Sequence, residues 1–140
     1  MFEYHAWATL RDAANPDDDA IAEASAATVS AIRLLLADPS VDNDFQSTDI
    51  RYVNGQWHVW LAGHRNHRNS DVLDAWRAIG IEAPGSYGLL YVHDDEAPEQ
   101  HNEWVAWSMA RGCVTVAPDP FLSPYVPVLE DPESWEAEPG

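Results

Sequence analysis

The sequence predicts an α+β fold in which two helices pack on one face of a mostly antiparallel sheet. Three observations support this prediction. Strand-like alternation of apolar and polar residues recurs along the chain, two longer segments carry apolar residues at helical spacing, and an Asn-Gly pair separates two strand-like runs. The predicted order is β-α-β-β-α-β-β-β, and its first six elements follow the split βαβ order of ferredoxin-like folds.

The N-terminal part predicts a strand and then a helix. Residues 2–11 alternate between an apolar and a mixed face, as a strand with one buried side does. Asn15 is a suitable N-cap because Pro16 follows at the first helical position. Acidic residues in the first turn complement the positive end of a helix; here they are Asp17, Asp18 and Asp19. Apolar residues at helical spacing continue to Leu36, and Asp38-Pro39 is expected to end the helix.

A hairpin is predicted in the middle of the chain. Residues 40–48 are polar and indicate a loop. Residues 49–53 and 56–62 are strand-like and flank Asn54-Gly55, which favours a tight turn because both central positions need positive φ. Residues 63–68 then indicate a polar connection.

A second helix and three more strands complete the predicted sheet. Ser70 is the expected N-cap of a helix that runs to Ile79 and stops at Gly80. Residues 87–93 are apolar on both faces, as a central strand is. A last hairpin turns near Gly112, and its two strands are residues 104–111 and 113–117.

The C-terminal part is rich in proline and lacks basic residues. We expect residues 118–131 to form an extended arm that wraps over the surface of a single domain spanning residues 1–131. Residues 132–140 are predicted to be an acidic, mobile tail.

Two helices on one face leave the other face of the sheet needing a cover. The predicted strands carry tryptophans that this cover would bury, namely Trp7, Trp60, and Trp104 or Trp107. We expect the arm to supply the cover through Phe121, Leu122, Tyr125 and Val126. The alternative is an exposed aromatic patch, which on a soluble protein marks a binding surface.

Composition limits the function classes. The 140 residues include 7 Lys+Arg and 24 Asp+Glu, for a formal charge of −17, and all seven bases are arginine. Such a charge disfavours direct binding to nucleic acid or to an anionic membrane, and it favours a monomer or a weak dimer. Hydrophobic residues at 46% argue against a disordered acidic chain. One cysteine, Cys113, excludes an internal disulfide, and without a signal or spanning segment we expect a cytoplasmic protein.

Candidate chemistry is concentrated in the loop Gly63, His64, Arg65, Asn66, His67, Arg68. His64 and His67 have a metal-ligand spacing, but the flanking arginines would repel a dication and a third ligand is missing. We therefore predict no metal and no other cofactor. The favoured partners of this loop are the protein's own carboxylates: Asp71, Asp74 or the acidic segment after the strand at 87–93. We predict no catalytic residues.

Four motifs together resemble the immunity protein 7 family of bacterial polymorphic toxin systems. They are Phe2-Glu3-Tyr4-His5-Ala6-Trp7, the loop 63–68, Ala83-Pro84-Gly85-Ser86-Tyr87-Gly88-Leu89-Leu90-Tyr91, and Asp119-Pro120-Phe121-Leu122-Ser123-Pro124-Tyr125. The resemblance spans roughly residues 1–131. Ala6 departs from the glycine expected before Trp7, and Glu133–Gly140 lies outside.

The resemblance implies a stoichiometric inhibitor without enzymatic activity. It would bind the C-terminal domain of a secreted or contact-delivered toxin, often a nuclease, inside the producing cell. The resemblance assigns no interface residues.

A nuclease has a cationic cleft, so carboxylates offered to it would speed association. Our first candidate surface is the acidic connector, defined as Asp94, Asp95, Glu96, Glu99 and Glu103, with Trp104 or Trp107 as buried anchors. The second is Asp17, Asp18 and Asp19.

Two alternatives remain open for the function. One is a non-specific acidic scaffold or DNA mimic, and the other is a small metal hydrolase that uses His64 and His67.

Overall fold

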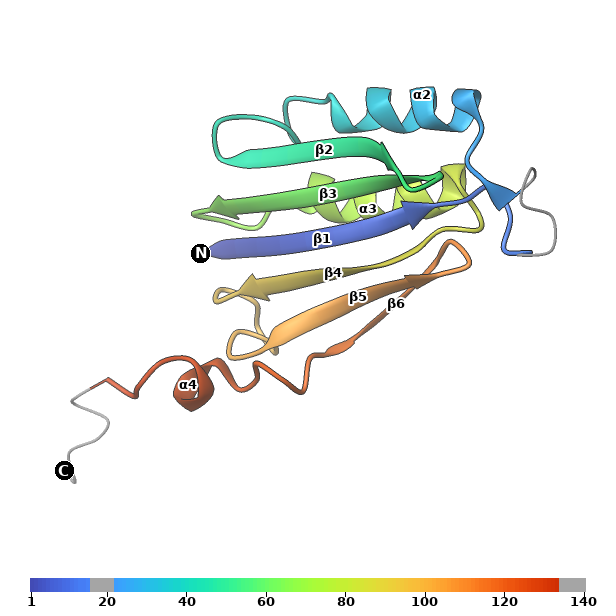
Figure 1. Cartoon of the computed structure of the whole chain (residues 1–140). Helices are drawn as coiled ribbons and strands as arrows, with labels where there is room; N and C mark the ends of the chain where they lie inside the picture. The colour runs from blue at the N-terminus through green and yellow to red at the C-terminus, as the bar shows by residue number, and fades with distance from the viewer. Residues whose placement is uncertain (16–21, 134–140) are drawn as a thin grey trace.

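A computed structural model describes residues 1–15 and 22–133 of the chain and shows an antiparallel sheet with helices against it (Figure 1). The strands are β1 (Phe2–Leu10), β2 (Gln46–Val53), β3 (Gln56–Arg65), β4 (Tyr87–Asp94), β5 (Trp104–Ala110) and β6 (Cys113–Pro118). The described helices are α2 (Ala26–Leu36), α3 (Ser70–Glu82) and the short α4 (Tyr125–Val128). The α+β class and the element order are as predicted.

The sheet order is β2-β3-β1-β4-β5-β6, and every neighbouring pair is antiparallel. Because β1 lies between β3 and β4, each long helical connection skips one strand, which is the arrangement of a split βαβ unit. The last hairpin, β5 and β6, extends this ferredoxin-like part beyond β4.

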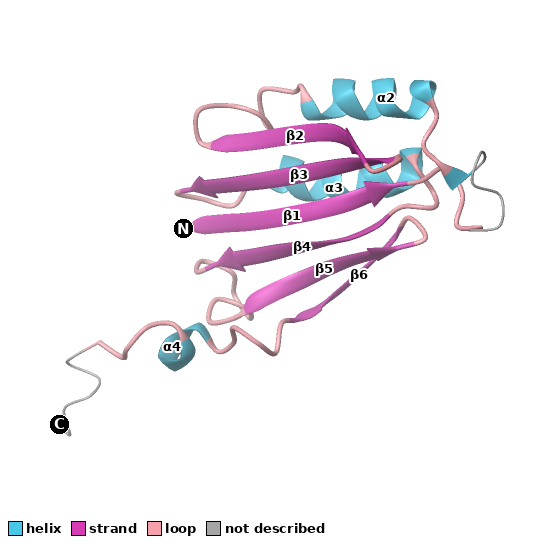
Figure 2. Ribbon diagram, in the orientation of Figure 1, coloured by secondary structure: helices cyan, strands magenta, loops and turns pink. Residues whose placement is uncertain are grey.

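The core lies between the sheet and the two long helices. Figure 2 shows α3 behind the sheet, so the opposite face of the sheet looks toward the viewer. Alternate residues of β1 point into the core, where Phe2, Tyr4 and Leu10 are fully buried. They pack with apolar side chains of α2 and α3, including Ile32 and Trp76. We refer to the two sides as the helix face and the open face.

Both predicted hairpin turns are confirmed. Asn54 and Gly55 have φ of 52° and 82°, and Arg111 and Gly112 have φ of 50° and 71°. Positive φ at both central residues matches the right-handed twist of the flanking strands.

The helix predicted over residues 16–36 is interrupted before Ser25. α2 starts at Ala26, and its N-cap is Ser25, whose hydroxyl accepts a hydrogen bond from the backbone N–H of Thr28. Glu23 instead pairs with Arg11 in an isolated β-bridge, which sets the chain on a non-helical path just before this cap. The predicted helical start at Pro16 and the acidic residues Asp17, Asp18 and Asp19 lie outside the described residues.

The first hairpin is longer than the sequence predicted. β2 begins at Gln46 rather than at residue 49, because the buried Gln46 amide donates to the Ser40 carbonyl and accepts from Asn69. β3 continues through Arg65 instead of ending at residue 62, because His64 and Arg65 stay in register with the first residues of β1. Polar side chains at the start of β2 and at the end of β3 therefore made these strand residues look like loop in the sequence.

The second helix is also displaced at both ends. Its N-cap is Asn69, not Ser70, and the Asn69 side chain accepts from the Asp71 N–H. Gly80, the predicted stop, lies inside α3, which runs to Glu82. A Cβ at this position would collide with the Gly112 carbonyl, so the glycine lets α3 approach the β5–β6 turn.

The C-terminal arm does not cover the open face as predicted. The Asp119 N–H donates to the Trp104 carbonyl, the Tyr125 N–H donates to the Asn102 carbonyl, and Tyr125 stacks on His93 at 4.1 Å. The arm is thus hydrogen-bonded to the start of β5 and to the residue Asn102 before it, and it includes the helical turn α4. The side chain of Phe121 is 81% exposed. Trp7 and Trp60 are 40% and 41% exposed, so the prediction that the arm buries these two tryptophans is wrong.

Candidate partner-binding surfaces

The loop after β3 meets the acidic connector at one end of the sheet. The Arg68 guanidinium lies 3.2 Å from the Asp94 carboxylate, and the side chain of Asp94 is only 7% exposed. The other carboxylate oxygen of Asp94 accepts from the Glu96 N–H. A buried carboxylate with a cation and a backbone donor is satisfied inside the protein, so Asp94 serves the fold.

The next two acids of the connector are also paired. The α-amino group of Met1 donates to Asp95 at 2.6 Å, and this hydrogen bond raises the pKa of the amine. His67 Nδ1 lies 2.7 Å from Glu96. The contacts of Arg68 and His67 confirm that the loop pairs with the protein's own carboxylates. These partners come from the connector rather than from Asp71 or Asp74.

The two remaining connector acids are not neutralised in this way. Glu99 is exposed and Glu103 is half-buried. Within residues 1–15 and 22–133, no ion pair reaches either of them. Of the connector, Asp95, Glu96, Glu99 and Glu103 therefore face solvent to some degree, whereas Asp94 does not.

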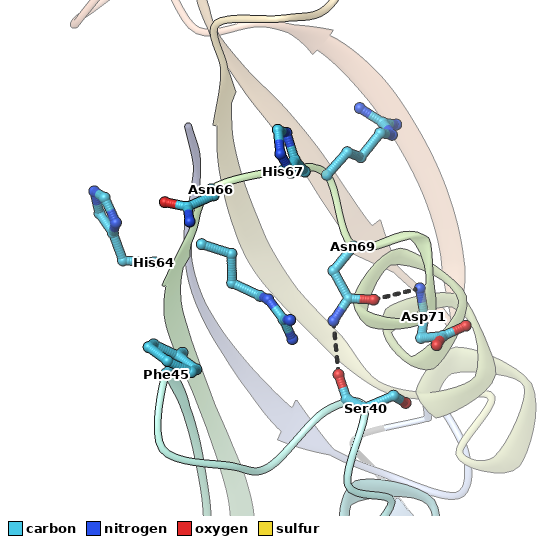
Figure 3. Close-up of a pocket in the computed structure, with 9 residues that line it drawn as sticks. Ser40, Phe45, His64, Asn66, His67, Asn69 and Asp71 are labelled. Carbon is cyan, nitrogen blue, oxygen red and sulfur yellow. Dashed lines mark hydrogen bonds between the residues drawn. The ribbon is translucent and has the colours of Figure 1, made fainter.

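A cavity of about 750 Å³ lies between the loop after β3 and the segment before β2. Figure 3 shows Asn69 holding these two segments together by donating to the Ser40 carbonyl, while its own carbonyl oxygen accepts from Asp71. His64 and His67 lie apart at this site. No group of three or more His, Cys, Asp or Glu side chains in the described part of the chain is arranged to hold a metal ion.

The motifs at residues 83–91 and 119–125 hold elements of the fold together. Ser86 is fully buried, and its hydroxyl accepts from the Arg11 N–H while its carbonyl accepts from the Gly112 N–H. The Asp119 carboxylate accepts from the Leu122 N–H, and the Ser123 hydroxyl accepts from the Trp104 N–H. These side chains fix the junctions of β1, β4, β5 and the arm.

The two tryptophans predicted as anchors lie on different faces. Trp104 is on the open face but only 7% exposed, because the arm and His93 pack around it. Trp107 is half-buried on the helix face, under the Arg77 guanidinium at 5.0 Å, and its carbonyl accepts from the Trp76 indole. As they stand, neither offers a free aromatic ring beside the acids.

Three exposed aromatic rings lie together on the open face of the sheet, whereas the exposed rings of Phe45, Tyr52 and Phe121 lie elsewhere. Trp60 of β3, Trp7 of β1 and Tyr87 of β4 are 41%, 40% and 41% exposed. Trp7 and Trp60 are register partners, and Trp7 meets Tyr87 edge to face at 6.1 Å. We call these three residues the aromatic row. Sequence alternation places Trp7 and Trp60 opposite the core, whereas it does not distinguish the two sides of the strand that contains Tyr87, because this strand is apolar on both faces.

Comparison with known proteins identifies one similarity. A family model described as Immunity protein 7 matches residues 1–131. Neither the curated proteins nor the solved structures compared with the chain include a match. Among the described helices, none combines the length and apolar character that a membrane span requires.

Proposed function

Because the chain belongs to the immunity protein 7 family, we propose that it binds one cognate bacterial toxin domain and neutralises it inside the producing cell. The observation that carries this proposal is the family match across residues 1–131, which includes every strand of the sheet and the arm. The hydrogen bonds of Ser86, Asp119 and Ser123, which join strands and the arm, support inhibition by binding rather than by catalysis.

We further propose that the toxin domain is basic and is a nuclease. The formal charge of −17, with no lysine, favours a cationic partner, and a nuclease cleft is cationic because it must bind phosphates. Long-range attraction raises the association rate, which matters for an inhibitor that must act before the toxin cleaves its substrate.

The carboxylates proposed to steer association are the accessible ones of the connector: Asp95, Glu96, Glu99 and Glu103. Asp94 contributes through Arg68 to the shape of this end of the sheet. Asp17, Asp18 and Asp19 remain a second proposed steering surface, and they lie outside the described residues. Steering needs charge near the interface but not direct contact, so these acids can act from its rim.

The test is a calorimetric titration of the purified protein against the toxin domain encoded beside its gene, at two salt concentrations. We expect one-to-one binding with a dissociation constant of about 1 nM or below, weaker binding at the higher salt, and loss of toxin activity at equimolar inhibitor. An unrelated basic protein of equal net charge is the control. Equal affinity for both proteins would favour the non-specific acidic scaffold, and no binding to the folded toxin domain would contradict the proposal.

A further inference from the structure

The aromatic row is a preformed apolar surface that none of residues 1–15 and 22–133 covers. Trp60, Trp7 and Tyr87 stand on three adjacent strands at the centre of the sheet. His58 packs beside Trp60 at 5.7 Å. Its Nε2 donates to the Val53 carbonyl, so its Nδ1 accepts from the Thr9 hydroxyl at 3.2 Å. The surroundings of the row are therefore fixed by packing and hydrogen bonds, and little order has to be gained on binding.

No described segment lies over the aromatic row. The two long helices pack on the other face, and the arm is held at the start of β5 by its hydrogen bonds to Asn102 and Trp104 (Figure 1). Contiguous exposed aromatic surface of this kind marks a protein interaction site.

Carboxylates stand at both ends of this surface. Asp49 of the edge strand β2 is the register partner of Trp60. Beyond Trp7, a cavity of about 370 Å³ is lined by Tyr91 and Trp104 of the sheet, by Phe121 and Leu122 of the arm, and by Glu3 and Asp119. Asp49 pairs with Arg51 and Glu3 lies 2.7 Å from His5, and such surface contacts exchange readily for a partner's cation.

Aromatic rings beside carboxylates form the environment that arginine and lysine side chains bind. The apolar stem packs on the ring, the cation lies over its face, and the carboxylate pairs with the charged tip. We propose that the open face, from Asp49 and Trp60 across Trp7 and Tyr87 to the cavity at Glu3 and Trp104, is the surface on which an arginine- and lysine-rich face of the toxin domain docks. This inference rests on the proposed function and names the contact surface for it.

Two other occupants fit the shape of the face but not its charge. A second copy of the chain would bring two molecules of −17 together. Single-stranded nucleic acid stacks on aromatic residues of small sheets, but its phosphates would be repelled by the same charge. A basic protein surface satisfies both the rings and the carboxylates.

The test compares a double variant of the row, Trp7→Ala with Trp60→Ala, with a control that removes exposed apolar side chains from the helices, Leu34→Ala with Ile81→Ala. Leu34 and Ile81 are 78% and 76% exposed. We expect the row variant to bind the toxin domain about 100-fold more weakly, mainly through faster dissociation, and the control to bind like the wild type. Undiminished binding by a folded row variant overturns the inference and leaves the proposed function standing. A wild-type protein that does not bind removes both.

A second pair of variants changes only charge and keeps the test valid if the tryptophan variant fails to fold. Glu3→Gln with Asp49→Asn removes the two rim carboxylates, and Asp74→Asn with Glu82→Gln removes two exposed carboxylates of α3. We expect the rim variant to associate about 10-fold more slowly at low salt than the α3 variant, because only its charges face the partner. Equal association rates for these two variants, which have the same net charge, overturn the inference.

The competing occupants are tested on the free protein. Sedimentation of the wild type and titration with a fluorescent single-stranded RNA 20-mer are the two measurements. We expect a monomer and no RNA binding at physiological salt. A dimer that Trp7→Ala with Trp60→Ala dissociates, or RNA binding that the same variant abolishes, would assign the face to that occupant and overturn the inference.

Discussion

The two faces of the sheet place aromatic side chains in opposite environments, although one strand supplies both. Along β1, Tyr4 points to the helix face and is fully buried, whereas Trp7 points to the open face and is 40% exposed. The helix face continues this contrast with Trp76 of α3, which is completely enclosed, and the open face continues it with Trp60. Each face receives every second side chain of β1. The two faces differ because α2 and α3 pack on the helix face only.

The two faces are therefore expected to serve different properties: the helix face the stability of the fold, and the open face the affinity for a partner. On the helix face, aromatic and aliphatic side chains pack against one another and remove apolar area from water, which stabilises the fold. On the open face, the rings of the aromatic row are fixed by neighbouring side chains but remain accessible. Substitutions on the helix face are therefore expected to change the free energy of unfolding, and those on the open face to change affinity.

The largest expected effect is on the helix face, for Trp76→Ala. This change leaves a large cavity and removes the hydrogen bond from the indole to the Trp107 carbonyl at 3.1 Å. We expect a loss of about 3–5 kcal/mol in the free energy of unfolding. Trp60→Ala, the matched change on the open face, is expected to cost about 1 kcal/mol or less. Urea denaturation of both variants checks this, and equal losses would remove the distinction between the faces.

The next effect tests how closely a helix approaches the last hairpin. In Gly80→Ala the new Cβ would collide with the Gly112 carbonyl, which is backbone and cannot turn aside. We expect a loss of about 1–3 kcal/mol, measured as a lower urea midpoint. An unchanged or raised midpoint, as better helix propensity alone would give, would show that α3 and the β5–β6 turn are farther apart than described.

A third effect compares two ion pairs at the loop end of the sheet. Arg68→Ala leaves the Asp94 carboxylate buried without its cation, and we expect a loss of about 1–3 kcal/mol. His67→Ala removes a contact to Glu96 in which both side chains are exposed, and we expect a change within about 0.5 kcal/mol. Thermal unfolding of both variants at pH 7 is the measurement. A larger loss for His67→Ala would contradict the assignment of Asp94 to the fold.

The smallest expected effect concerns the Tyr4 hydroxyl. It is buried without a hydrogen-bond partner among the described residues, and burial raises the pKa of Tyr4 from 10.0 to about 12. The folded protein therefore holds this proton where the unfolded chain releases it, so its contribution to stability is complete below pH 10 and is lost as the pH rises toward 12.

In Tyr4→Phe the unpartnered hydroxyl is gone, and we expect a gain of up to about 1 kcal/mol at pH 8. The variant should also lose less stability than the wild type between pH 8 and pH 11. Urea midpoints of both proteins at the two pH values measure this. A clear loss at pH 8 would show that the hydroxyl has a partner.

Much of the fold was predictable because local chemistry determined it. Asn54-Gly55 and the turn at Gly112 need positive φ, and the alternation of β1 sets which of its residues are buried. The ends of the elements were less predictable. Ser25 and Gln46 were expected within a helix and a loop, but the first is a cap and the second is held in a strand by contacts to Ser40 and Asn69.

The candidate site was predictable in part. The sequence indicated that the loop 63–68 pairs with the protein's own acids, which the Arg68–Asp94 and His67–Glu96 contacts confirm. It did not indicate that Trp104 is enclosed by the arm while Trp7 and Trp60 are not, because long-range packing of residues 119–125 decides this. Local sequence patterns therefore do not predict which part of the sheet the arm covers.

Hydroxyl-radical labelling of the wild-type protein, alone and bound to the toxin domain, tests most directly whether the open face is the binding face. Oxidation of each tryptophan is measured by mass spectrometry of its peptide. We predict that Trp7 and Trp60 react in the free protein and are protected in the complex, while Trp76 stays unreactive in both. Equal reactivity of Trp7 and Trp60 in the free and bound states would contradict this account.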